Sequence, residues 1–595
     1  MVTNATVRGV NDFYWTFLEG ILLFDQDTDG DENFYLFKVD TRFESPEPVQ
    51  LTTTKGVKTR IIALSPDRPT MAAIASNERD RRFFDPYLLN IITGKKTSIF
   101  ALNRAVDKIV FDQYLVPRVA SFSEKNGSVT TLTRSSNDVR PFWPNFYHQV
   151  SFGNEMMPIS ISYDGSKVYF LENMNGDFLE LVERDFGSFN SSRYVVHTPR
   201  VKADLMKPTL HMKLLAPMFV LENYAKPELV ALEPQYVSDV EGIKAFAGDS
   251  VATISSITTD ASKWLVRLEN SADRAQYFLY DTSTKKMTFL LKEMPNNPTK
   301  ETPQYSIKRF FELRTRDGLV ELCYITIPVQ YDIYNNGTPS EPLPTVLLPH
   351  GGPWRRDNWI FDPRIQFLAN RGYAVLQCQF RGSKGFGKTL LNKGNREWGG
   401  RMQSDLIDAV WYCVQNGITQ PKKVAIFGGS YGGYATLAGM TFQPNIFACG
   451  ISVVGVSDLL HLLRATPVYW LGAASVSLKF RIGDNTTDIG RQRLREASPV
   501  FYAHNIIRPL LIAQGANDIR VPKFQADTIV DAMNRNDIPV TYVLFENEGH
   551  GFRNPLNNIG FFALVDEFLH KCLGGRHEPI GDDFERSSGS IIQNP

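Results

Sequence analysis

The stretch Gly428-Gly429-Ser430-Tyr431-Gly432 is a G-x-S-x-G sequence placed between two regular elements. The apolar run at Lys423–Phe427 predicts a buried strand before it, and Tyr434–Met440 predict a helix after it. A tight turn from strand to helix holds a serine hydroxyl clear of the backbone, and the flanking glycines relieve the crowding that such a turn creates. We therefore expect Ser430 to be a nucleophile. The alternative is a glycine-rich connector in some other α/β protein.

Two partners for this serine follow buried strands later in the chain. The apolar run Pro509–Gln514 leads to Asp518, and Val540–Phe545 leads to His550. Because parallel strands present their carboxyl ends at one edge of a sheet, we expect these side chains to meet Ser430 there. His550 would accept the serine proton as a general base, and Asp518 would fix the imidazole tautomer. Taken singly, Asp518 could be a turn residue and His550 a surface histidine.

An acyl-transfer site also needs backbone donors for the oxyanion that develops. The predicted strand Thr345–Pro349 runs into His350-Gly351-Gly352-Pro353, a loop whose backbone could turn an N–H toward the pocket. We expect the two oxyanion donors to be the N–H of Gly352 and the N–H of Tyr431, the residue after the nucleophile. The alternative for this loop is a simple β-turn followed by proline.

Six motifs lie between residues 345 and 552: His350–Pro353, Phe380–Gly387, Trp398–Gly400, Gly428–Tyr434, Asn517–Pro522 and Gly549–His550. Together they resemble the prolyl oligopeptidase family of serine peptidases, most closely its acylaminoacyl-peptidase and dipeptidyl-peptidase-like branch. The resemblance implies an α/β-hydrolase catalytic domain, with a doubly wound and mostly parallel sheet, preceded by an all-β propeller. It also implies that the residue two positions after the acid, here Arg520, binds the substrate backbone. A surface salt bridge is the alternative for that arginine.

The first three hundred residues are rich in predicted strands and contain a repeat. A turn of S-x-D type recurs at Ser65–Asp67, Ser162–Gly165 and Thr258–Asp260, with its aspartates 97 and 96 residues apart. This spacing fits two units of about 48 residues, the length of a four-stranded propeller blade. We count about six blades, whereas the resemblance implies seven. An array of β-sandwiches is the alternative.

An acidic run in the first unit, Asp25-Gln26-Asp27-Thr28-Asp29-Gly30, begins like a calcium-binding loop. Its twelfth position is Leu36, where such a loop needs a bidentate glutamate, and predicted strands flank it where helices are required. We interpret the run as an acidic hairpin turn.

The chain is expected to divide into a propeller of six to seven blades at residues 1–292 and a catalytic domain at 305–575. A proline-rich linker at 293–304 would join them. The last predicted helix ends before Gly574-Gly575, a favoured helix stop. Residues 576–595 are expected to form a polar tail.

The composition of the chain limits the classes of partner that it can bind. The chain has 64 Lys and Arg against 64 Asp and Glu, a balance that argues against nucleic acid or an anionic membrane surface. Its five cysteines are isolated in the sequence, which predicts reduced thiols in a cytoplasmic protein. The spacing of cysteines and histidines suggests no metal site, and we expect no cofactor.

These observations predict a serine peptidase that hydrolyses short peptides through an acyl-enzyme intermediate, in the manner of an oligopeptidase, an acylaminoacyl-peptidase or a dipeptidyl-peptidase. Two alternatives stay open: a carboxylesterase of the same fold, and an inactive binding protein built on the propeller. Short peptides are the expected partners, and a homo-oligomer is compatible with the sequence.

Overall fold

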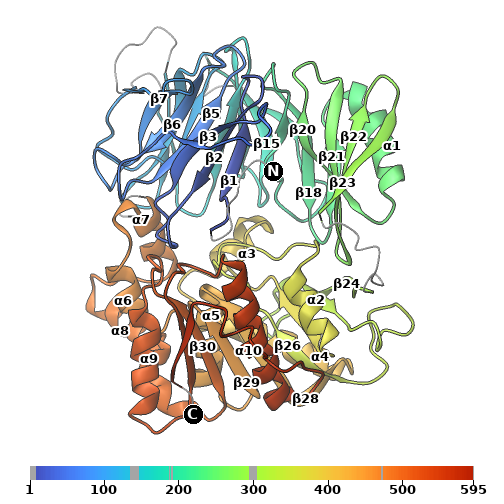
Figure 1. The fold of residues 1–595 in the computed structure, drawn as a ribbon, viewed down its shortest axis with the longest axis vertical. Helices are drawn as coiled ribbons and strands as arrows, with labels where there is room; N and C mark the ends of the chain where they lie inside the picture. Colours follow the sequence, from blue (N-terminus) through green and yellow to red (C-terminus); the bar gives the residue numbers. More distant parts are fainter. Residues whose placement is uncertain are drawn as a thin grey trace.

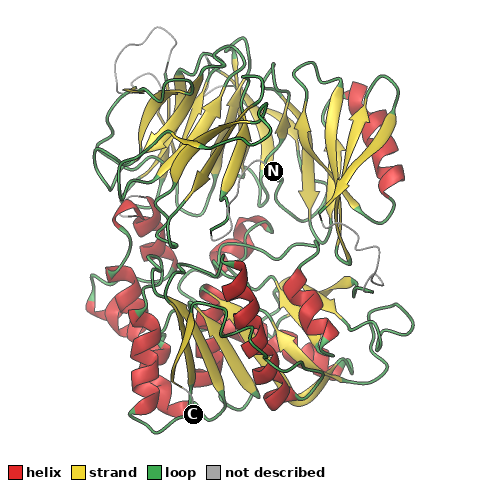
Figure 2. Ribbon diagram, in the orientation of Figure 1, coloured by secondary structure: helices red, strands yellow, loops and turns green. Residues whose placement is uncertain are grey.

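The computed structural model describes residues 8–134, 147–186, 188, 192–293, 304–470 and 473–593. Figure 1 shows a half built from the residues before 293 lying above a second half built from the residues after 304. Strands dominate the upper half, whereas most helices lie in the lower one (Figure 2). The predicted linker at 293–304 falls outside the described residues, except for its two ends.

Six small antiparallel sheets form the upper half, and each pairs strands that are neighbours in the chain, as propeller blades do. The blades are β1–β4 (Asp12–Trp15, Ile21–Gln26, Tyr35–Asp40, Val49–Gln50), β5–β8 (Thr59–Leu64, Met71–Ser76, Asp85–Asn90, Lys96–Ser98), β9–β12 (Lys108–Phe111, Pro117–Ser123, Val129–Thr133, Tyr147–Val150), β13–β16 (Met156–Ile161, Lys167–Glu172, Glu180–Asp185, Tyr194–His197), β17–β19 (Thr209–Leu210, Pro217–Asn223, Pro227–Ala231) and β20–β23 (Val251–Ile257, Lys263–Asn270, Asp273–Asp281, Lys286–Lys292). The helix α1 (Val237–Ala247) precedes the last blade.

The recurring S-x-D turn joins the first and second strands of its blade each time. In two of the three copies the aspartate closes the turn: Asp164 Oδ1 accepts from Ser166 N at 3.0 Å, and Asp260 Oδ1 accepts from Ser262 N at 3.0 Å. The prediction of a propeller is therefore confirmed, with six blades. The described residues contain no sheet for the seventh blade that the resemblance implies.

The lower half is built on one nine-stranded sheet with the order β24-β25-β27-β26-β28-β29-β30-β31-β32. The six strands from β27 to β31 in this order run parallel, and the three others pair antiparallel at the two edges. The bounds are β24 Lys308–Arg314, β25 Val320–Thr326, β26 Leu343–Leu347, β27 Ala374–Cys378, β28 Thr419–Gly429, β29 Cys449–Val453, β30 Leu510–Gly515, β31 Thr541–Phe545 and β32 Gly589–Gln593.

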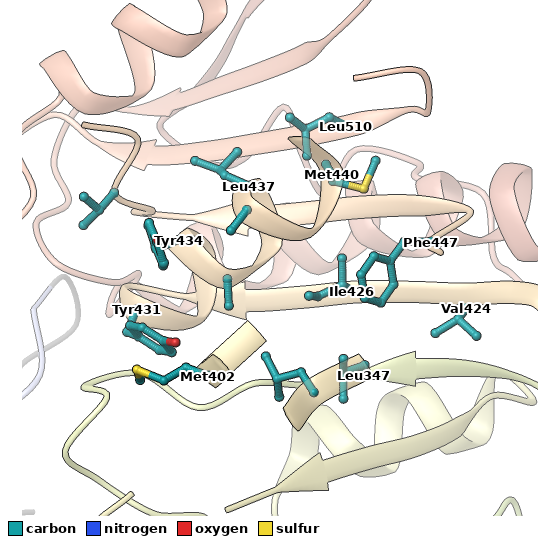
Figure 3. Packing of buried hydrophobic residues seen from close by; sticks show 14 of the residues in the cluster. Leu347, Met402, Val424, Ile426, Tyr431, Tyr434, Leu437, Met440, Phe447 and Leu510 are labelled. Carbon is teal, nitrogen blue, oxygen red and sulfur yellow. The ribbon is translucent and has the colours of Figure 1, made fainter. Parts of the chain in front are cut away.

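Helices cover both faces of this sheet, because the central strands alternate their apolar side chains between two cores. In β28, Val424 and Ile426 face the core that holds α4, α5 and α9, whereas Ala425 and Phe427 face α2 and α10. Figure 3 shows the first core, where Tyr434, Leu437 and Met440 of α5 pack over the strands. The helices are α2 Pro363–Asn370, α3 Gly387–Lys393, α4 Arg401–Gln415, α5 Tyr431–Phe442, α6 Leu459–Arg464, α7 Ala473–Arg481, α8 Asp488–Glu496, α9 Phe524–Asn534 and α10 Pro555–Leu573.

The α/β-hydrolase expectation, a doubly wound and mostly parallel sheet, is thus confirmed. Each aliphatic side chain buried in these cores contributes about 1.5–3 kcal/mol, so the sheet edge that carries the predicted site has a rigid base. Within the described ranges, no helix combines the length and the apolar character needed to cross a bilayer.

The expectation of a polar tail at 576–595 is corrected by β32, which extends the sheet antiparallel to β31. Polar contacts hold this segment: Ser588 N donates to Asn557 Oδ1 at 2.8 Å, and Asn534 Nδ2 donates to Gln593 Oε1 at 2.8 Å. Since the strand is held by hydrogen bonds and exposes its Ile592, hydrophobic patterning gives no sign of it.

The expectation of five reduced thiols is also corrected. Cys323 pairs with Cys378, and Cys449 pairs with Cys572, across 55 and 123 residues of chain. The first pair lies directly opposite on neighbouring strands β25 and β27, and the second joins β29 to α10. Spacing along the chain cannot reveal such pairs, because the fold alone brings them together. Cys413 is free and buried, and burial raises its pKa to about 12.

Candidate active site

Ser430 stands at the turn between β28 and α5 with φ 60°, the left-handed region that residues other than glycine rarely occupy. The neighbouring glycines allow this turn. A Cβ atom on Gly428 would lie 2.4 Å from the carbonyl carbon of Gly432, and one on Gly432 would lie 2.2 Å from Pro349 O. The local sequence therefore produces the strained strand-to-helix turn that presents a nucleophile.

The structure brings Ser430, Asp518 and His550 together at the carboxyl edge of the sheet. His550 Nε2 lies 3.0 Å from Ser430 Oγ, and His550 Nδ1 lies 2.7 Å from Asp518 Oδ2. A carboxylate only accepts hydrogen bonds, so Nδ1 carries the proton and Nε2 is free to accept from the serine hydroxyl. Asp518 is itself held in place, because its Oδ1 accepts from the backbone N–H groups of Arg520 and Val521 at 2.8 and 2.9 Å.

The two expected oxyanion donors lie beside this group. Tyr431 is the first residue of α5, so its N–H has no acceptor within the helix. Gly352 has φ 122°, and a Cβ atom on its neighbour Gly351 would lie 3.5 Å from Ser430 Cβ. Gly352 and Tyr431 line the same cavity as Ser430. The glycine loop therefore runs against the nucleophile turn, as a donor loop must.

His350 lies apart from the proton-transfer chain. Its ring stacks on Phe380 with centroids 4.4 Å apart, and its Nε2 lies 2.9 Å from Ser383 Oγ. Burial lowers the pKa of His350 below its usual 6.5, so the ring is neutral at pH 7. These contacts indicate that the His350 side chain holds the glycine-rich loop in place.

A cavity of about 800 Å³ surrounds the nucleophile. Its size is in the range of sites that enclose a small ligand. The segments Val453–Leu463 and Tyr469–Phe480 both contribute to its wall, through Val453, Val454, Val456, Leu462, Trp470 and Leu478. Among the described residues, no group of three or more His, Cys, Asp or Glu side chains is arranged to hold a metal ion.

Arg520 lines this cavity and forms an ion pair with the propeller. Its Nε lies 2.5 Å from Glu32 Oε1, and Lys58 Nζ lies 3.2 Å from Glu32 Oε2. Burial alone would raise the pKa of Glu32, but its contacts with Arg520 and Lys58 hold that pKa below 4.5. Glu32 is therefore ionised at neutral pH, and a propeller carboxylate contacts Arg520, which lines the cavity.

Sequence reasoning missed Glu32 entirely. It lies two residues beyond the acidic run that was interpreted as a hairpin turn, and the structure does place that run in the turn between β2 and β3. The signal available was a tight cluster of carboxylates in a turn that lacks the bidentate glutamate of a calcium loop. Nothing in that pattern says that the turn faces the catalytic domain.

The model of the prolyl oligopeptidase family matches residues 359–576, a range that contains Ser430, Arg520, Asp518 and His550. Two curated relatives match almost the whole chain. Dipeptidyl aminopeptidase BIII from Pseudoxanthomonas mexicana is 37% identical over 593 residues, covering 99% of this chain and 84% of that protein. Dipeptidyl peptidase family member 6 from Caenorhabditis elegans is 32% identical over 628 residues, covering 99% and 82%.

A puromycin-hydrolyzing peptidase from Mycobacterium tuberculosis has the same fold, with a TM-score of 0.73 and 21% identity over 97% of this chain and 87% of that one. The likeness extends through propeller and catalytic domain alike. The two full-length relatives are named as peptidases, which favours a peptidase over the esterase and the inactive binding protein that the sequence left open. The chain belongs to the prolyl oligopeptidase family and is a serine peptidase.

Proposed function

We propose that this peptidase removes dipeptides from the free amino end of short peptides, with Ser430 as nucleophile, His550 as general base and acid, and Asp518 as the group that orients the imidazole. The continuous chain of contacts from Asp518 through His550 to Ser430, at 2.7 and 3.0 Å, carries this proposal. These contacts end at Ser430 in a cavity of about 800 Å³, whose size favours a short peptide over a folded protein as substrate.

The reaction begins when Ser430 Oγ attacks the scissile carbonyl carbon while His550 Nε2 takes the hydroxyl proton. The carbonyl oxygen becomes an oxyanion, which the N–H groups of Gly352 and Tyr431 stabilise. His550 then returns the proton to the leaving amine, and an acyl-enzyme ester remains on Ser430. A water molecule, activated by the same imidazole, hydrolyses that ester and restores the serine.

A dipeptidyl specificity requires the enzyme to bind the terminal ammonium of its substrate at a set distance from the nucleophile. Glu32 and Arg520 together suit this task. The guanidinium has a planar fork of donors for substrate carbonyl oxygens, and the ionised carboxylate beside it attracts an ammonium group. The names of the two relatives that match the full chain support the same specificity.

Acylaminoacyl-peptidase activity is the second candidate. Glu32 already has two cationic neighbours, so the group Glu32–Arg520–Lys58 carries a net charge of one positive unit. Such a group also suits the carbonyl oxygen of an N-acyl substrate. Several relatives that match about 40% of the chain are named acylamino-acid-releasing enzymes, for example one from Arabidopsis thaliana at 23% identity over 38% of this chain.

Three p-nitroanilide substrates separate the two specificities: a dipeptide with a free amino group, its N-acetylated form, and an N-acetylated single amino acid. We expect the free dipeptide to have the highest kcat/KM. The Glu32→Gln variant should lower kcat/KM for that substrate and leave the acetylated substrates unchanged. Preference for an acetylated substrate in the wild-type enzyme would instead assign the acylaminoacyl activity.

Labelling with a fluorophosphonate tests the triad independently of substrate choice. The wild-type enzyme should be labelled once, and Ser430→Ala should lose the label together with about 10⁶-fold in kcat. A folded wild-type protein that takes no label would overturn the roles assigned to Ser430 and His550.

The cytoplasmic location expected from the sequence rested on reduced cysteines. The two disulfides remove that ground, because structural disulfides are typical of oxidising compartments. Thiol alkylation of cell fractions under denaturing conditions without reductant would decide between the two locations. A protein isolated with five free thiols would support the cytoplasm, and one with a single free thiol would support an oxidising compartment.

A further inference from the structure

The turn between β2 and β3 of the first propeller blade lies directly against the loop that carries His550. A Cβ atom on Gly30 would lie 2.3 Å from Gly549 N, and a Cβ atom on Gly549 would lie 2.1 Å from Gly30 O. Gly30 has φ 83°. Neither position has room for a side chain, so backbone packs on backbone one residue before the catalytic histidine.

The same turn also contacts the loop that carries Asp518. Asn517 Nδ2 donates to Asp29 O at 2.8 Å, and the backbone N–H of Asn517 donates to Glu548 O at 2.9 Å. Asn517 immediately precedes the catalytic acid. The two catalytic loops are therefore tied to each other, and each is tied separately to one propeller turn.

Arg8, whose side chain is 12% exposed, completes the connection. Arg8 binds Asp27 in the turn through two hydrogen bonds of 2.8 and 3.0 Å, and its Nη1 lies 2.8 Å from Glu548 Oε2. Both carboxylates have side chains at most 1% exposed. The other oxygen of Glu548 accepts from Asn554 N at 2.8 Å, at the start of α10. Glu548 thus links the propeller to both ends of the segment that contains His550.

We propose that this turn, residues 27–30, together with Arg8 and Glu548, is a positioning element that holds His550 and Asp518 in register with Ser430. None of its contacts reaches the reacting atoms, so its members act through the loops they hold. Proton transfer needs the imidazole within hydrogen-bond reach of the serine, and a displacement of 1 Å can cost about 100-fold in rate. This inference rests on the triad roles proposed above.

A matched pair of glycine variants tests the proposal. Gly30 and Gly56 are both propeller glycines with positive φ, at 83° and 69°, but a Cβ atom on Gly56 would meet nothing within 4 Å. Gly30→Ala and Gly56→Ala therefore share the backbone strain, and only Gly30→Ala pushes on the His550 loop. We expect Gly30→Ala to lower kcat and the rate of fluorophosphonate labelling by about 100-fold, with KM within about threefold of wild type. Gly56→Ala should stay within about twofold in all three.

A second pair covers the case in which Gly30→Ala does not fold. Asn517→Ala removes the bond to Asp29 O and a second bond, at 3.1 Å, to Glu546 O, whereas Asn536→Ala removes a side-chain bond to Ala532 O. We expect kcat and labelling to fall at least about tenfold in Asn517→Ala, which loses two hydrogen bonds, and to be unchanged in Asn536→Ala.

Folded Gly30→Ala protein with the kcat of Gly56→Ala would overturn the proposal, as would wild-type kcat in Asn517→Ala. A fall confined to KM would assign these residues to substrate binding and would contradict a positioning role. Failure of the triad assignment gives a different result, since the wild-type enzyme would then take no fluorophosphonate label in any of these comparisons.

Discussion

Replacing Asp518 by asparagine is the sharpest test of the catalytic geometry, because the surroundings dictate which way the new amide must face. Oδ1 of Asp518 accepts from two backbone N–H groups, those of Arg520 and Val521, at 2.8 and 2.9 Å. An amide nitrogen at that position would oppose two donors. The asparagine oxygen must therefore take it, which leaves the amide NH₂ facing His550 Nδ1 across the present 2.7 Å.

That orientation forces the wrong tautomer on the imidazole. Nδ1 must accept from the amide, so the ring proton moves to Nε2, which faces Ser430 Oγ at 3.0 Å and can no longer accept the hydroxyl proton. In a triad with the same roles, this change costs about 10⁴-fold in kcat. Four decades correspond to about 5 kcal/mol of activation free energy. We expect Asp518→Asn to show that loss.

The assay is steady-state hydrolysis of a dipeptidyl p-nitroanilide at saturating substrate, with fluorophosphonate labelling as a second measure of serine reactivity. Both rates should fall together, whereas KM and the melting temperature should change little, since the substituted side chain has the same shape. Asp518→Asn protein that keeps more than about a tenth of the wild-type kcat would refute the tautomer argument. It would mean that another group sets the state of His550.

Three further outcomes are expected. Gly432→Ala places a Cβ atom 2.2 Å from Pro349 O, so it should cost about 1–3 kcal/mol of stability and lower kcat at least about tenfold. Gly176→Ala, whose Cβ atom meets open space, should change neither quantity. Calorimetry measures the stability of the two variants, and turnover of a p-nitroanilide measures their kcat. Cys572→Ser opens a disulfide across 123 residues and should lower the free energy of unfolding, measured in urea, by about 4–5 kcal/mol. Dithiothreitol should affect the β29–α10 region of the wild type alone, and equal effects of the reductant on both proteins would contradict this. Burial alone would raise the pKa of Asp27, but Arg8 holds that pKa below 3.8. The ionised Asp27 therefore stabilises the fold above pH 4, and this contribution is lost as the pH falls through the lowered pKa. The melting temperature of Asp27→Asn should accordingly vary less than that of the wild type between pH 5 and pH 3.

The meeting of Ser430, Asp518 and His550 was predictable because each residue follows the end of a strand. An apolar run of five or six residues identifies a buried parallel strand, and the carboxyl ends of such strands must share an edge. Ser430, Asp518 and His550 all follow runs of this kind, and the structure places them within hydrogen-bonding distance of one another. The propeller was predictable for a similar reason, since the S-x-D turn repeats at the end of the first strand in three of the six blades.

What escaped prediction depends on contacts between distant segments. The bond from Cys449 to Cys572 and the pairing of β32 with β31 both join residues whose meeting the local sequence does not signal. A strand held by polar contacts, with an exposed Ile592, looks like a tail when only hydrophobic alternation is considered. Glu32 belongs to the same class, because its role exists only where the propeller meets Arg520.

The propeller turn that contacts the catalytic loops shows the same limit of prediction from local sequence. In the sequence Gly549 is only the neighbour of His550, yet its missing side chain makes room for Gly30 O. Likewise, the acidic run around Asp27 lacks the ligands of a calcium loop, and its charge is balanced by Arg8. Each of these residues has an ordinary local explanation, and none of those explanations requires a second domain. Because the propeller turn and the catalytic loops touch through backbone atoms, any motion that separates Gly30 from Gly549 must also strain the bond between Asn517 and Asp29. The geometry of proton transfer in this enzyme therefore depends on the position of the propeller relative to the catalytic domain.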